Sequence, residues 1–478
     1  MPSDNKKITS RTEDFSQWYL DVIEAADLAE HSPVRGSMII KPEGYALWER
    51  IVAAVDGLFK DKGVRNAYFP LFIPESFLKR EADHVEGFAP EVAVVTHAGG
   101  EKLNEALVVR PTSETIINDA FSRWVHSYRD LPLVINQWAN VVRWELRPRL
   151  FLRTTEFLWQ EGHTAHATPE EADERARQML EVYRVIAEEY LAIPAILGVK
   201  SDAEKFAGAD KTYTVETMMQ DGKALQFATS HNLGQNFSKP FNIQFATEAG
   251  GLEYAWQTSW GLSTRVIGGL IMSHSDDTGL VLPPNIAPVQ VVITSIGKTE
   301  GTDSGVLDAC NALAHQLRTA NVRVHIDARS MRPGEKFFEW EKKGVPIRVE
   351  VGPKDIEKNQ VILARRDRAE KHTVSLDEAC GSISDMLALI QKDMFAAAKK
   401  RRDENTVRVE NWEEFEQAIE AGKFVLAHWS GRKEDEAAIK EKTKATVRCI
   451  PMDAPEEDGK CVLSGQPSKR RALFARSY

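Results

Sequence analysis

The chain has 478 residues and a formal net charge of −10, with 42% hydrophobic and 28% charged residues. This is the profile of an ordinary globular protein, long enough for two or three domains. No run approaches the ~18 apolar residues that a membrane span needs, and the polar first residues lack the apolar core of a secretion signal. We therefore expect no membrane partner and a cytoplasmic location, and any RNA partner of this acidic chain must meet a local surface.

The cysteines are too few and too far apart to organise the fold. They stand at Cys310, Cys380, Cys449 and Cys461, and no CxxC pair occurs. The sequence therefore suggests neither a disulfide framework nor a compact zinc knuckle.

The first half of the chain alternates helical and extended patterns. Residues 1–36 carry an apolar stripe at helical spacing and are expected to be helical, and residues 43–61 repeat that spacing. Residues 66–74 predict a strand closed by prolines. Residues 131–146 predict another strand, and a capped start with proline in the first turn predicts a long helix over 168–192.

The pattern changes after residues 281–288, which we interpret as a linker. Strands then alternate with helices predicted at 305–319 and 334–343, as expected of a small parallel or mixed sheet with right-handed crossovers. The last ~80 residues form a charge-rich third unit by the usual domain-size prior. The basic run at 399–404 marks a second candidate boundary, and it is more simply a solvated surface than a phosphate contact.

Neither a Walker-type loop nor GxGxxG occurs, so any ATP must be held by side chains. Three weak segments stand in a suggestive order: a helix running into a strand at 63–70, Arg143-Trp144-Glu145 with the arginine-rich loop after it, and Arg265 between glycines at 261–269. Alone, these segments are more typical of a helix–turn–strand, a surface ion pair and a capped, packed helix, respectively, than of a nucleotide site. Together they form a much rarer set.

That set resembles the three signature motifs of class II aminoacyl-tRNA synthetases, and within the class it is most similar to the prolyl-tRNA synthetases. The resemblance covers most of residues 40–293 and continues at KGVPIRVEVGPKD (343–355) and the terminal FARSY. The other resembling segments are HVEGFAPEVAVVT (84–96), VRPTSET (109–115), RWELRPRLFLRTTEFLWQEGHTAH (143–166), TSHNLGQNFSK (229–239), SWGLSTRVIGG (259–269) and LVLPPNIAPVQVVI (280–293).

The resemblance implies an enzyme that activates L-proline with ATP, releases pyrophosphate and transfers the prolyl group to the 3′ end of tRNA(Pro). It implies ATP and Mg²⁺ as cofactors, with Arg143 and Arg265 as catalytic residues. Guanidinium groups suit this role because they offer paired donors to carboxylate and phosphate oxygens. Phe157 is expected to stack on the adenine. The ATP-binding residues implied are Arg143, Glu145, Arg153, Phe157, Gln226, Thr229 and Arg265.

The resemblance also implies a pocket for a secondary ammonium and a small apolar ring. Glu114 suits the ammonium, since an anion can accept from both N–H groups of the ring nitrogen. His163 and His166 could instead be a metal pair, but Gly162 and the lack of a nearby third ligand argue against that. The proline-binding residues implied are Phe88, Thr112, Glu114, Arg143, Trp159, Glu161, His163, His231 and Ser263.

A proline pocket cannot strictly exclude smaller side chains, which lose only ~1–3 kcal/mol of packing. We therefore expect some activation of cysteine or alanine. Some relatives carry a large editing domain between the second and third motifs. Here Glu145 and Arg265 are 120 positions apart, and other elements fill that interval, so the resemblance is to the archaeal and eukaryotic-like type without the editing insertion.

The second unit resembles the anticodon-binding domain of these enzymes. Splayed RNA bases are read by stacking and by polar side chains, and the two guanines that proline anticodons share suit arginine and carboxylate partners. A solvated charge cluster is the simpler alternative. The anticodon-binding residues implied are Phe337, Glu341, Arg348, Lys354 and Asp355.

The C-terminal unit departs from the family pattern. Many relatives bind a structural zinc there with four cysteines, which align here with Ser430, Asp435, Cys461 and Ser464. Serine is a poor zinc ligand, because tetrahedral zinc prefers soft anionic groups. We expect no zinc in this chain.

The fold class expected is therefore α+β. A class II catalytic domain (1–285), an antiparallel sheet flanked by helices, precedes an α/β anticodon-binding domain (286–395) and a small α/β C-terminal domain (396–478) of degenerate zinc-binding type. The resemblance implies a homodimer formed through the first motif. A non-catalytic paralogue that binds RNA or regulates a partner is the alternative, but it would be expected to lose ATP-contacting residues. An activating enzyme with a non-tRNA acceptor is disfavoured by the anticodon-like unit.

Overall fold

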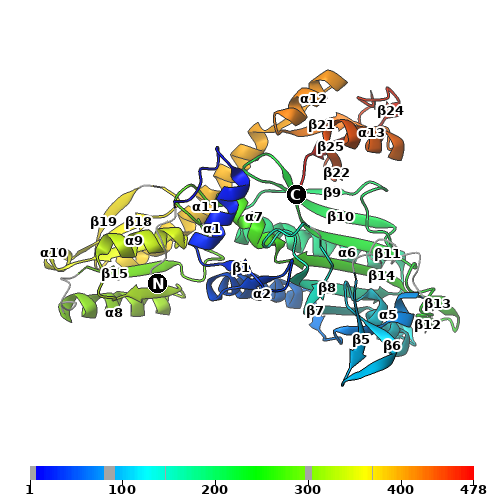
Figure 1. Cartoon of the computed structure of the whole chain (residues 1–478), viewed down its shortest axis with the longest axis horizontal. Coiled ribbons are helices and arrows are strands. Elements are labelled where there is room, and N and C mark those ends of the chain that lie inside the picture. Colours follow the sequence, from blue (N-terminus) through cyan, green and yellow to red (C-terminus); the bar gives the residue numbers. More distant parts are fainter. Residues whose placement is uncertain (1–6, 80–91, 146, 297–303, 369) are drawn as a thin grey trace.

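The computed structural model describes residues 7–79, 92–145, 147–296, 304–368 and 370–478, and Figure 1 shows them as three lobes. Within this part of the chain, one sheet has eleven strands and another has five. We call the lobe built on β3 to β14 the central unit, the lobe built on the five-stranded sheet the α/β unit, and the lobe that holds β20 to β25 the C-terminal unit.

The central unit is an antiparallel sheet in the order β9-β10-β11-β14-β8-β7, with β3 parallel to β7 at its edge. Its strands are β3 (Arg65–Asn66), β7 (Leu133–Val142), β8 (Glu156–His166), β9 (Ala195–Val199), β10 (Lys211–Met218), β11 (Ala224–Gly234) and β14 (Trp256–Ser263). Strand β7 confirms the strand predicted over 131–146.

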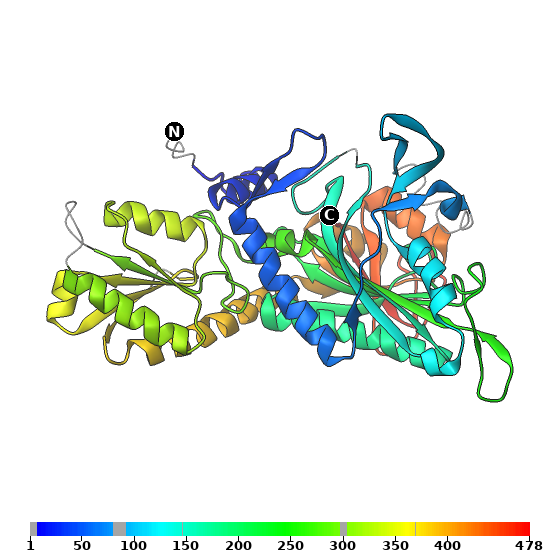
Figure 2. The ribbon, with the colours of Figure 1, turned by 90° about the horizontal axis from the view of Figure 1, so that it is seen from below.

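Helices bury one face of this sheet. The helix α6 (Pro169–Val185) lies across β11 and β14, and α2 (Pro42–Asp61) packs against α6 (Figure 2). Apolar residues at helical spacing make this contact, so α2 buries Leu47, Ile51, Val55 and Phe59 in the core. Thr168 caps α6 by accepting from the Glu171 backbone N–H at 3.2 Å. Both helix predictions are confirmed, and a π-helical turn at Ile186–Tyr190 extends α6.

Two predictions for the first 80 residues are wrong. The described part of 1–36 holds only the helix α1 (Phe15–Ala25), since Asp27 turns the chain with a φ of 57° into β1 (Ala29–His31) and β2 (Met38–Ile40). The stretch 66–74 is not one strand, because only its first residue, in β3, and its last three, in β4 (Phe72–Pro74), belong to strands.

A small satellite packs beside β7. It contains the sheet β4-β6-β5 and the hairpin β12-β13. Its elements are α3 (Glu75–Lys79), β5 (Ala93–Ala98), β6 (Glu101–Val109), α5 (Glu114–Trp124), a 3-10 turn (Tyr128–Asp130), β12 (Gln244–Ala246) and β13 (Leu252–Tyr254).

The α/β unit is a mixed sheet in the order β16-β15-β17-β18-β19, with the first three strands parallel, and Figure 2 shows helices on both of its faces. Its strands are β15 (Val291–Ser295), β16 (Val324–Asp327), β17 (Ile347–Val351), β18 (Gln360–Arg365) and β19 (Lys371–Ser375). Its helices are α8 (Ser304–Thr319), α9 (Pro333–Lys342), α10 (Pro353–Glu357) and the start of α11 (Ala379–Glu404). The predicted strand–helix alternation is confirmed.

The C-terminal unit extends the central sheet. Its strand β22 pairs with β9, so β20-β21-β25-β22 continue the same hydrogen-bonded sheet. Its elements are β20 (Thr406–Arg408), α12 (Trp412–Glu420), β21 (Phe424–His428), α13 (Lys433–Thr443), β22 (Thr446–Pro451), β23 (Gly459–Lys460), β24 (Pro467–Ser468) and β25 (Arg471–Ala475).

The basic run 399–404 lies inside α11, so the α/β and C-terminal units are joined by a continuous helix there. Its two arginines hydrogen-bond to the central unit: Arg401 donates to the Ser273 carbonyl at 2.9 Å and Arg402 to the Ala195 carbonyl at 3.0 Å. Contact with the central unit therefore holds a segment that the sequence suggested as a domain boundary with a solvated surface.

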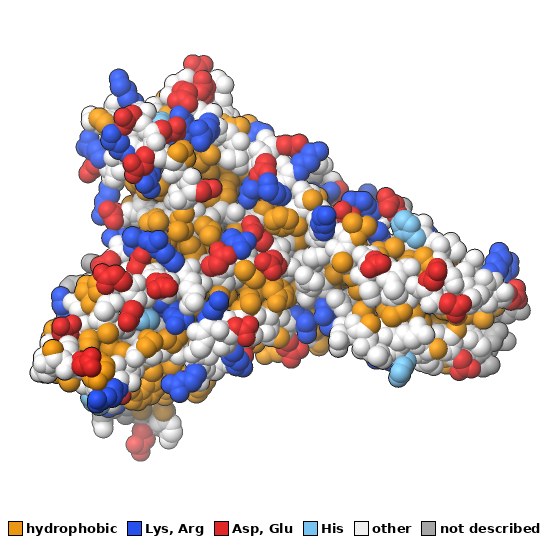
Figure 3. Space-filling view, turned by 180° about the vertical axis from the view of Figure 1, so that it is seen from behind, with side chains coloured by type: hydrophobic (Ala, Val, Ile, Leu, Met, Phe, Trp, Pro, Cys, Tyr) orange, Lys and Arg blue, Asp and Glu red, His pale blue; other side chains and the backbone are white. Residues whose placement is uncertain are grey.

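No described helix is long and apolar enough to cross a membrane. On the face seen in Figure 3, basic and acidic side chains are interspersed rather than gathered into one basic surface. This agrees with the net charge of −10 and directs attention to local sites.

Candidate active site

The open face of the central sheet carries two neighbouring rows of polar residues. Strand pairing aligns Thr212, His231, Ser259 and His163 in one row across β10, β11, β14 and β8. The next row aligns Thr214, Thr229, Gly261, Glu161 and Gln137. Side chains two residues apart on a strand share a face, so positions distant in sequence converge here.

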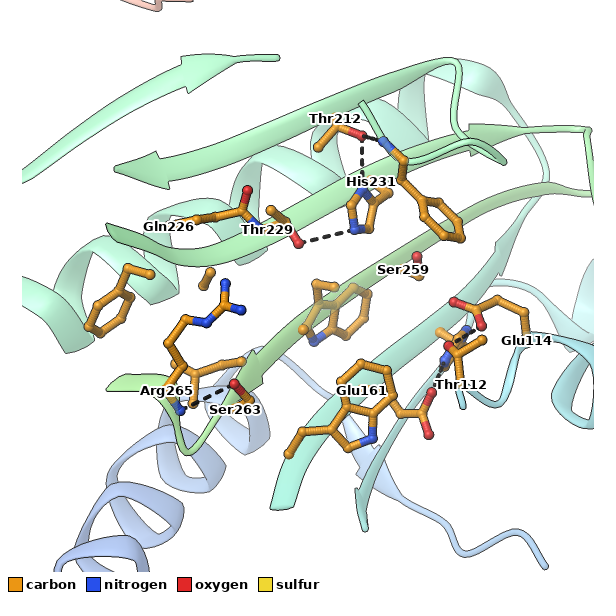
Figure 4. Close-up of a pocket in the computed structure, with 18 of the residues that line it drawn as sticks. Thr112, Glu114, Glu161, Thr212, Gln226, Thr229, His231, Ser259, Ser263 and Arg265 are labelled. Carbon is orange, nitrogen blue, oxygen red and sulfur yellow. Dashed lines mark hydrogen bonds and ion pairs between the residues drawn. The ribbon is translucent and has the colours of Figure 1, made fainter. Parts of the chain in front are cut away.

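These rows floor a cavity of about 290 Å³. Figure 4 shows its two ends: Arg265, Gln226 and Thr229 lie at one, and Thr112 and Glu114 at the other. Among the residues lining it are Thr112, Glu114, Arg143, Phe157, Trp159, Glu161, His163, Gln226, Thr229, His231, Ser263 and Arg265.

The end with Glu114 is a buried acidic network. Thr112 donates its hydroxyl hydrogen to Glu114. Glu161 accepts from the Ser113 hydroxyl at 2.5 Å, and from Gln137 at 2.9 Å. The His163 ring nitrogen lies 3.1 Å from Glu161. The network therefore places two carboxylates beside a single histidine.

Opposite effects act on the pKa values of this pair. Burial alone would raise the pKa of Glu161, but hydrogen bonds and charge from His163 lower it below its usual value. Burial alone would lower the pKa of His163, but Glu161 and then the charge of Glu114 raise it. Glu161 and His163 thus stabilise each other's charged form, and Glu114 is the second carboxylate at this end, which suits a cationic ligand group.

His231 is held in the neutral form. Its two ring nitrogens lie 2.9 Å from the Thr212 hydroxyl and 3.1 Å from the Thr229 hydroxyl. Burial, followed by the charge of His163, lowers the pKa of His231 to about 3. Its ring lies 5.0 Å from that of Phe206, so the two form a rigid wall of the cavity.

The opposite end is cationic. Arg143 donates to the Pro111 carbonyl at 2.9 Å, and its guanidinium lies 5.6 Å from the Phe157 ring and 5.3 Å from the Trp159 ring. Arg265 donates to the Leu152 carbonyl at 3.1 Å. Burial, then the charges of Arg143 and Arg153, lower the pKa of Arg265 to about 10, so it remains charged at neutral pH.

A second cavity of about 150 Å³ adjoins the first, because Arg143, Phe157, Ser263 and Arg265 line both. Glu145 lies here and accepts from Arg153 at 2.5 Å. The two cavities together form one continuous site. Three arginines gather at this end, an arrangement suited to a polyanion.

The structure thus brings the implied ATP and proline residues into one site, with one exception: Phe88 lies outside the described residues. It also adds lining residues that sequence reasoning missed, among them Lys205, Phe206 and Ser259. Lys205 and Phe206 come from the loop between β9 and β10, which has no motif. The alternation along β14, which brings Ser259 and Ser263 to one face, could have revealed Ser259.

The implied anticodon residues are only partly clustered. The Arg348 guanidinium lies 4.2 Å from the Phe337 ring and 3.0 Å from Glu341. Lys354 and Asp355 lie on α10, where the Asp355 carboxylate accepts a hydrogen bond from the Gly352 backbone N–H at 3.0 Å. Phe337, Glu341 and Arg348 thus form one cluster, and the α10 residues stand apart from it in their contacts.

The four residues aligned with zinc ligands do lie together. The Asp435 carboxylate accepts from Ser430 at 2.5 Å and from Ser464 at 2.6 Å, and the Cys461 sulfur lies 3.9 Å away. Burial alone would raise the pKa of Asp435, but the two serine hydroxyls outweigh it and lower it. One thiol, one carboxylate and two hydroxyls that already donate to that carboxylate do not fit tetrahedral zinc. Within the described ranges, no group of three or more His, Cys, Asp or Glu could hold a metal ion.

Comparisons with known proteins agree with this geometry. A model of the tRNA synthetase class II core domain (G, H, P, S and T) matches residues 97–274. A model of the anticodon binding domain matches residues 290–386, and one of the prolyl-tRNA synthetase C-terminal domain matches residues 412–478.

The similarity to individual proteins extends over the whole chain. A Proline--tRNA ligase of Chlorobium luteolum is 56% identical over 481 residues, which cover 99% of this chain and 99% of that protein. The Proline--tRNA ligase of Chlorobaculum tepidum shows the same identity and coverage. The crystal structure of prolyl-tRNA synthetase from Cryptosporidium parvum, complexed with halofuginone and AMPPNP, has a TM-score of 0.95 at 43% identity, over 99% of this chain and 97% of that one.

Proposed function

The chain belongs to the prolyl-tRNA synthetase family, and from this premise we propose that it activates L-proline with ATP and charges tRNA(Pro). The observation that carries the proposal is the order of charge in the cavity. Carboxylates and His163 stand at one end, and Arg143, Arg265 and Arg153 at the other. An amino acid bound with its ammonium at Glu114 presents its carboxylate toward Arg143 and the ATP end.

The first step needs no general base, because the reacting carboxylate is already ionised. Its oxygen attacks the α-phosphorus of ATP, a P–O bond to it forms, and the bond to the leaving pyrophosphate breaks. Arg143, which lines both cavities at the cationic end, neutralises both the carboxylate and the charge that builds on the α-phosphate. Arg265 and Arg153 hold the outer phosphates. Positioning and electrostatic stabilisation supply most of the rate.

Phe157 and Arg265 are the proposed supports of the adenine ring, which lies between an aromatic face and a guanidinium. Gln226 and Thr229 line the same end and supply polar contacts. Glu145 is engaged with Arg153, so its proposed role is to orient that arginine, as well as the adenine amino group. Mg²⁺ would be held mainly by the phosphate oxygens of ATP and by waters, with one or two carboxylates, and would neutralise part of the phosphate charge.

In the second step, a ribose hydroxyl at the 3′ end of tRNA attacks the prolyl carbonyl carbon, and AMP leaves. Phe337, Glu341 and Arg348 are the proposed readers of the anticodon, with Lys354 and Asp355 as further candidates on α10. Arginine suits the guanine O6 and N7 acceptors, and a carboxylate suits the donors of the Watson–Crick edge.

We propose three domains, at 1–285, 286–395 and 396–478. The support is that each lobe has its own buried apolar cluster. We also propose a cytoplasmic homodimer that contains no zinc. In the first-motif segment Tyr68 is 73% exposed and Phe72 44% exposed, a surface suited to burial against a second copy. Sedimentation of the chain as a monomer at micromolar concentration would contradict the dimer.

ATP–pyrophosphate exchange with each of the twenty amino acids tests the proposal. Proline is expected to support exchange most strongly, with cysteine or alanine weaker by about 10- to 200-fold. A charging assay with tRNA(Pro) then separates a synthetase from an enzyme with another acceptor. The non-catalytic alternative is not favoured, because Arg143, Glu145, Phe157 and Arg265 all line one continuous site. Absence of proline-dependent exchange would remove the proposal.

A further inference from the structure

The junction between the central and α/β units contains a cavity of about 280 Å³. Glu341 and Arg348 line it from the α/β unit, together with Arg366 and Arg368. Asp276 and Thr278 line it from the central unit. An occupant that touches the proposed anticodon residues therefore also meets the segment that follows α7 (Arg265–His274).

One ion pair closes this junction. The buried Arg366 guanidinium donates to both carboxylate oxygens of Asp276, at 2.7 and 2.8 Å. Its third nitrogen, Nε, donates to the Glu341 carbonyl at 2.8 Å. Arg366 thus joins the residue expected to read a base to the turn that follows α7.

Asp276 in turn organises the turn that follows α7. Its Oδ1 accepts from the Thr278 backbone N–H at 2.9 Å and from the Gly279 backbone N–H at 3.1 Å. Its carbonyl accepts from the Trp18 indole at 2.9 Å. Burial alone would raise the pKa of Asp276, but Arg366 lowers it to about 2, so the pair stays ionic at neutral pH.

The other end of α7 is the ATP site. The helix has 10 residues, is buried from Val266 to Ser273 and begins at Arg265. At 1.5 Å per residue it spans ~15 Å. A tightly packed helix shifts as one body, and a displacement of 1–2 Å is a common way to transmit binding. Such a shift at Asp276 would move Arg265 relative to the phosphates.

We propose that the Arg366–Asp276 pair couples occupancy of the junction cavity by an anticodon guanine to the placement of Arg265. A guanine beside Glu341 offers O6 and N7 acceptors to the arginines of the cavity, and Arg366 is shared between that base and Asp276. Asp276 is thus a positioning residue, which acts on the reaction through α7. This inference rests on the proposed function.

The test compares charging of full-length tRNA(Pro) with charging of a tRNA in which one of the two anticodon guanines is replaced by adenine. Asp276→Asn keeps the oxygen that caps the turn and removes the charge that holds Arg366. It is expected to lower kcat about tenfold on the parent tRNA and hardly at all on the substituted tRNA. The ratio of kcat on the parent tRNA to kcat on the substituted tRNA therefore falls toward one.

Arg366→Lys, alone and combined with Asp276→Asn, completes a double-mutant cycle. If the two residues act through each other, the kcat ratio of the two tRNAs falls no further in the double variant than in the stronger single variant. Glu43→Gln is the matched control, since it breaks the Lys343–Glu43 ion pair of 2.8 Å, which joins the same units through α2 instead of α7. This control is expected to leave the ratio unchanged.

Three results would overturn the coupling. The first is that Asp276→Asn leaves the kcat ratio of the two tRNAs unchanged. The second is that Asp276→Asn lowers tRNA-independent pyrophosphate exchange as much as it lowers charging. The third is that Glu43→Gln also lowers the kcat ratio. The parent enzyme separates this failure from failure of the proposed function. If the parent exchanges and charges proline, only the coupling has failed; if it does neither, the function itself is wrong.

Discussion

Two polar clusters, one in the C-terminal unit and one in the central unit, differ in how well their donors and acceptors match. Around Asp435 the two serine hydroxyls donate to one carboxylate, so the donors and the acceptor satisfy each other. In the active-site cavity, burial and then the charges of Arg143 and Arg153 instead act against the charge of Arg265 and lower its pKa to about 10. Like charges held together are stable only with a counter-charge, which the phosphates supply.

The comparison teaches how to separate structure from function in a polar cluster. A cluster whose donors and acceptors match has no need of a ligand, and its removal costs stability. A cluster with surplus charge of one sign facing a cavity is arranged for a ligand, and its removal costs activity. The following predictions test this division.

The largest effect is expected from Arg143→Ala. Loss of a fixed cation at the reacting phosphate should reduce pyrophosphate exchange by about a thousandfold while the melting temperature stays near that of the parent. Arg123→Ala is the matched control, since its side chain is 62% exposed on α5. Exchange that survives in Arg143→Ala at the level of the control would contradict the assigned role.

Glu114→Gln should affect proline more than ATP. It keeps the size of the side chain but removes the charge that accepts from the ammonium, a loss of about 1.5–3 kcal/mol. The KM for proline in the exchange assay is expected to rise about 10- to 100-fold, with the KM for ATP within about twofold. Equal changes in both constants would place Glu114 outside the amino-acid end.

Asp435→Ala should do the reverse of Arg143→Ala. It leaves the Ser430 and Ser464 donors without their acceptor, which costs about 2–4 kcal/mol and lowers the melting temperature by several degrees. Exchange at 25 °C is expected to remain. Asp435→Asn, which keeps an acceptor, should recover part of the loss.

Metal chemistry sharpens the same contrast. Treatment with EDTA is expected to leave the melting temperature of the parent unchanged, because its stability in this region comes from hydrogen bonds. The triple variant S430C/D435C/S464C, with the resident Cys461, is expected to bind one zinc per chain by elemental analysis. A tightly bound zinc in the parent would overturn the metal-free proposal.

The smallest effect is a dependence of stability on pH. Burial, then the charge of Arg175, lowers the pKa of His166 to about 3 in the folded state. In the unfolded chain the pKa of a histidine is about 6.5, so between these values only the unfolded state binds the proton. Stability from such a group is complete above the higher value and is lost as pH falls toward 3. At pH 5 the loss is about 2 kcal/mol for a fully buried histidine.

The Asp435 cluster should not share this loss. The lowered pKa of Asp435 means that its stabilisation disappears only below the ordinary range of an aspartate. Between pH 7.5 and pH 5, the melting temperature of the parent is therefore expected to fall, and His166→Gln should fall less. Equal falls in both would show that His166 takes up its proton equally well in the folded state, which would contradict its lowered pKa.

Sequence patterns predicted many of the elements, and the resemblance supplied the candidate site residues. The resemblance implied Trp159, Glu161 and His163, and the alternation along β8 brings their side chains to one face. The pattern could not predict that Phe206 closes the cavity, because its loop follows no period. It also could not separate α1 from the strands after it, where Asp27 alone turns the chain.

Long-range pairing was beyond reach for a different reason. The joining of β22 to β9 depends on register between residues such as Ile450 and Val199, which no local pattern encodes. The resemblance aligned the four positions that hold zinc in relatives, but it did not predict that Ser430 and Ser464 donate to Asp435. Local chemistry was therefore predictable, whereas the contacts between units were not.

The position of β25 has a genetic consequence. This strand, Arg471–Ala475, lies between β21 and β22, so it joins the outer strands to the rest of the sheet. A premature stop codon that removes residues from 471 onward deletes only a few residues but opens two strand edges, which are prone to mispairing. A nonsense mutation at this point should therefore be as damaging as one far upstream, and its short product should aggregate or be degraded.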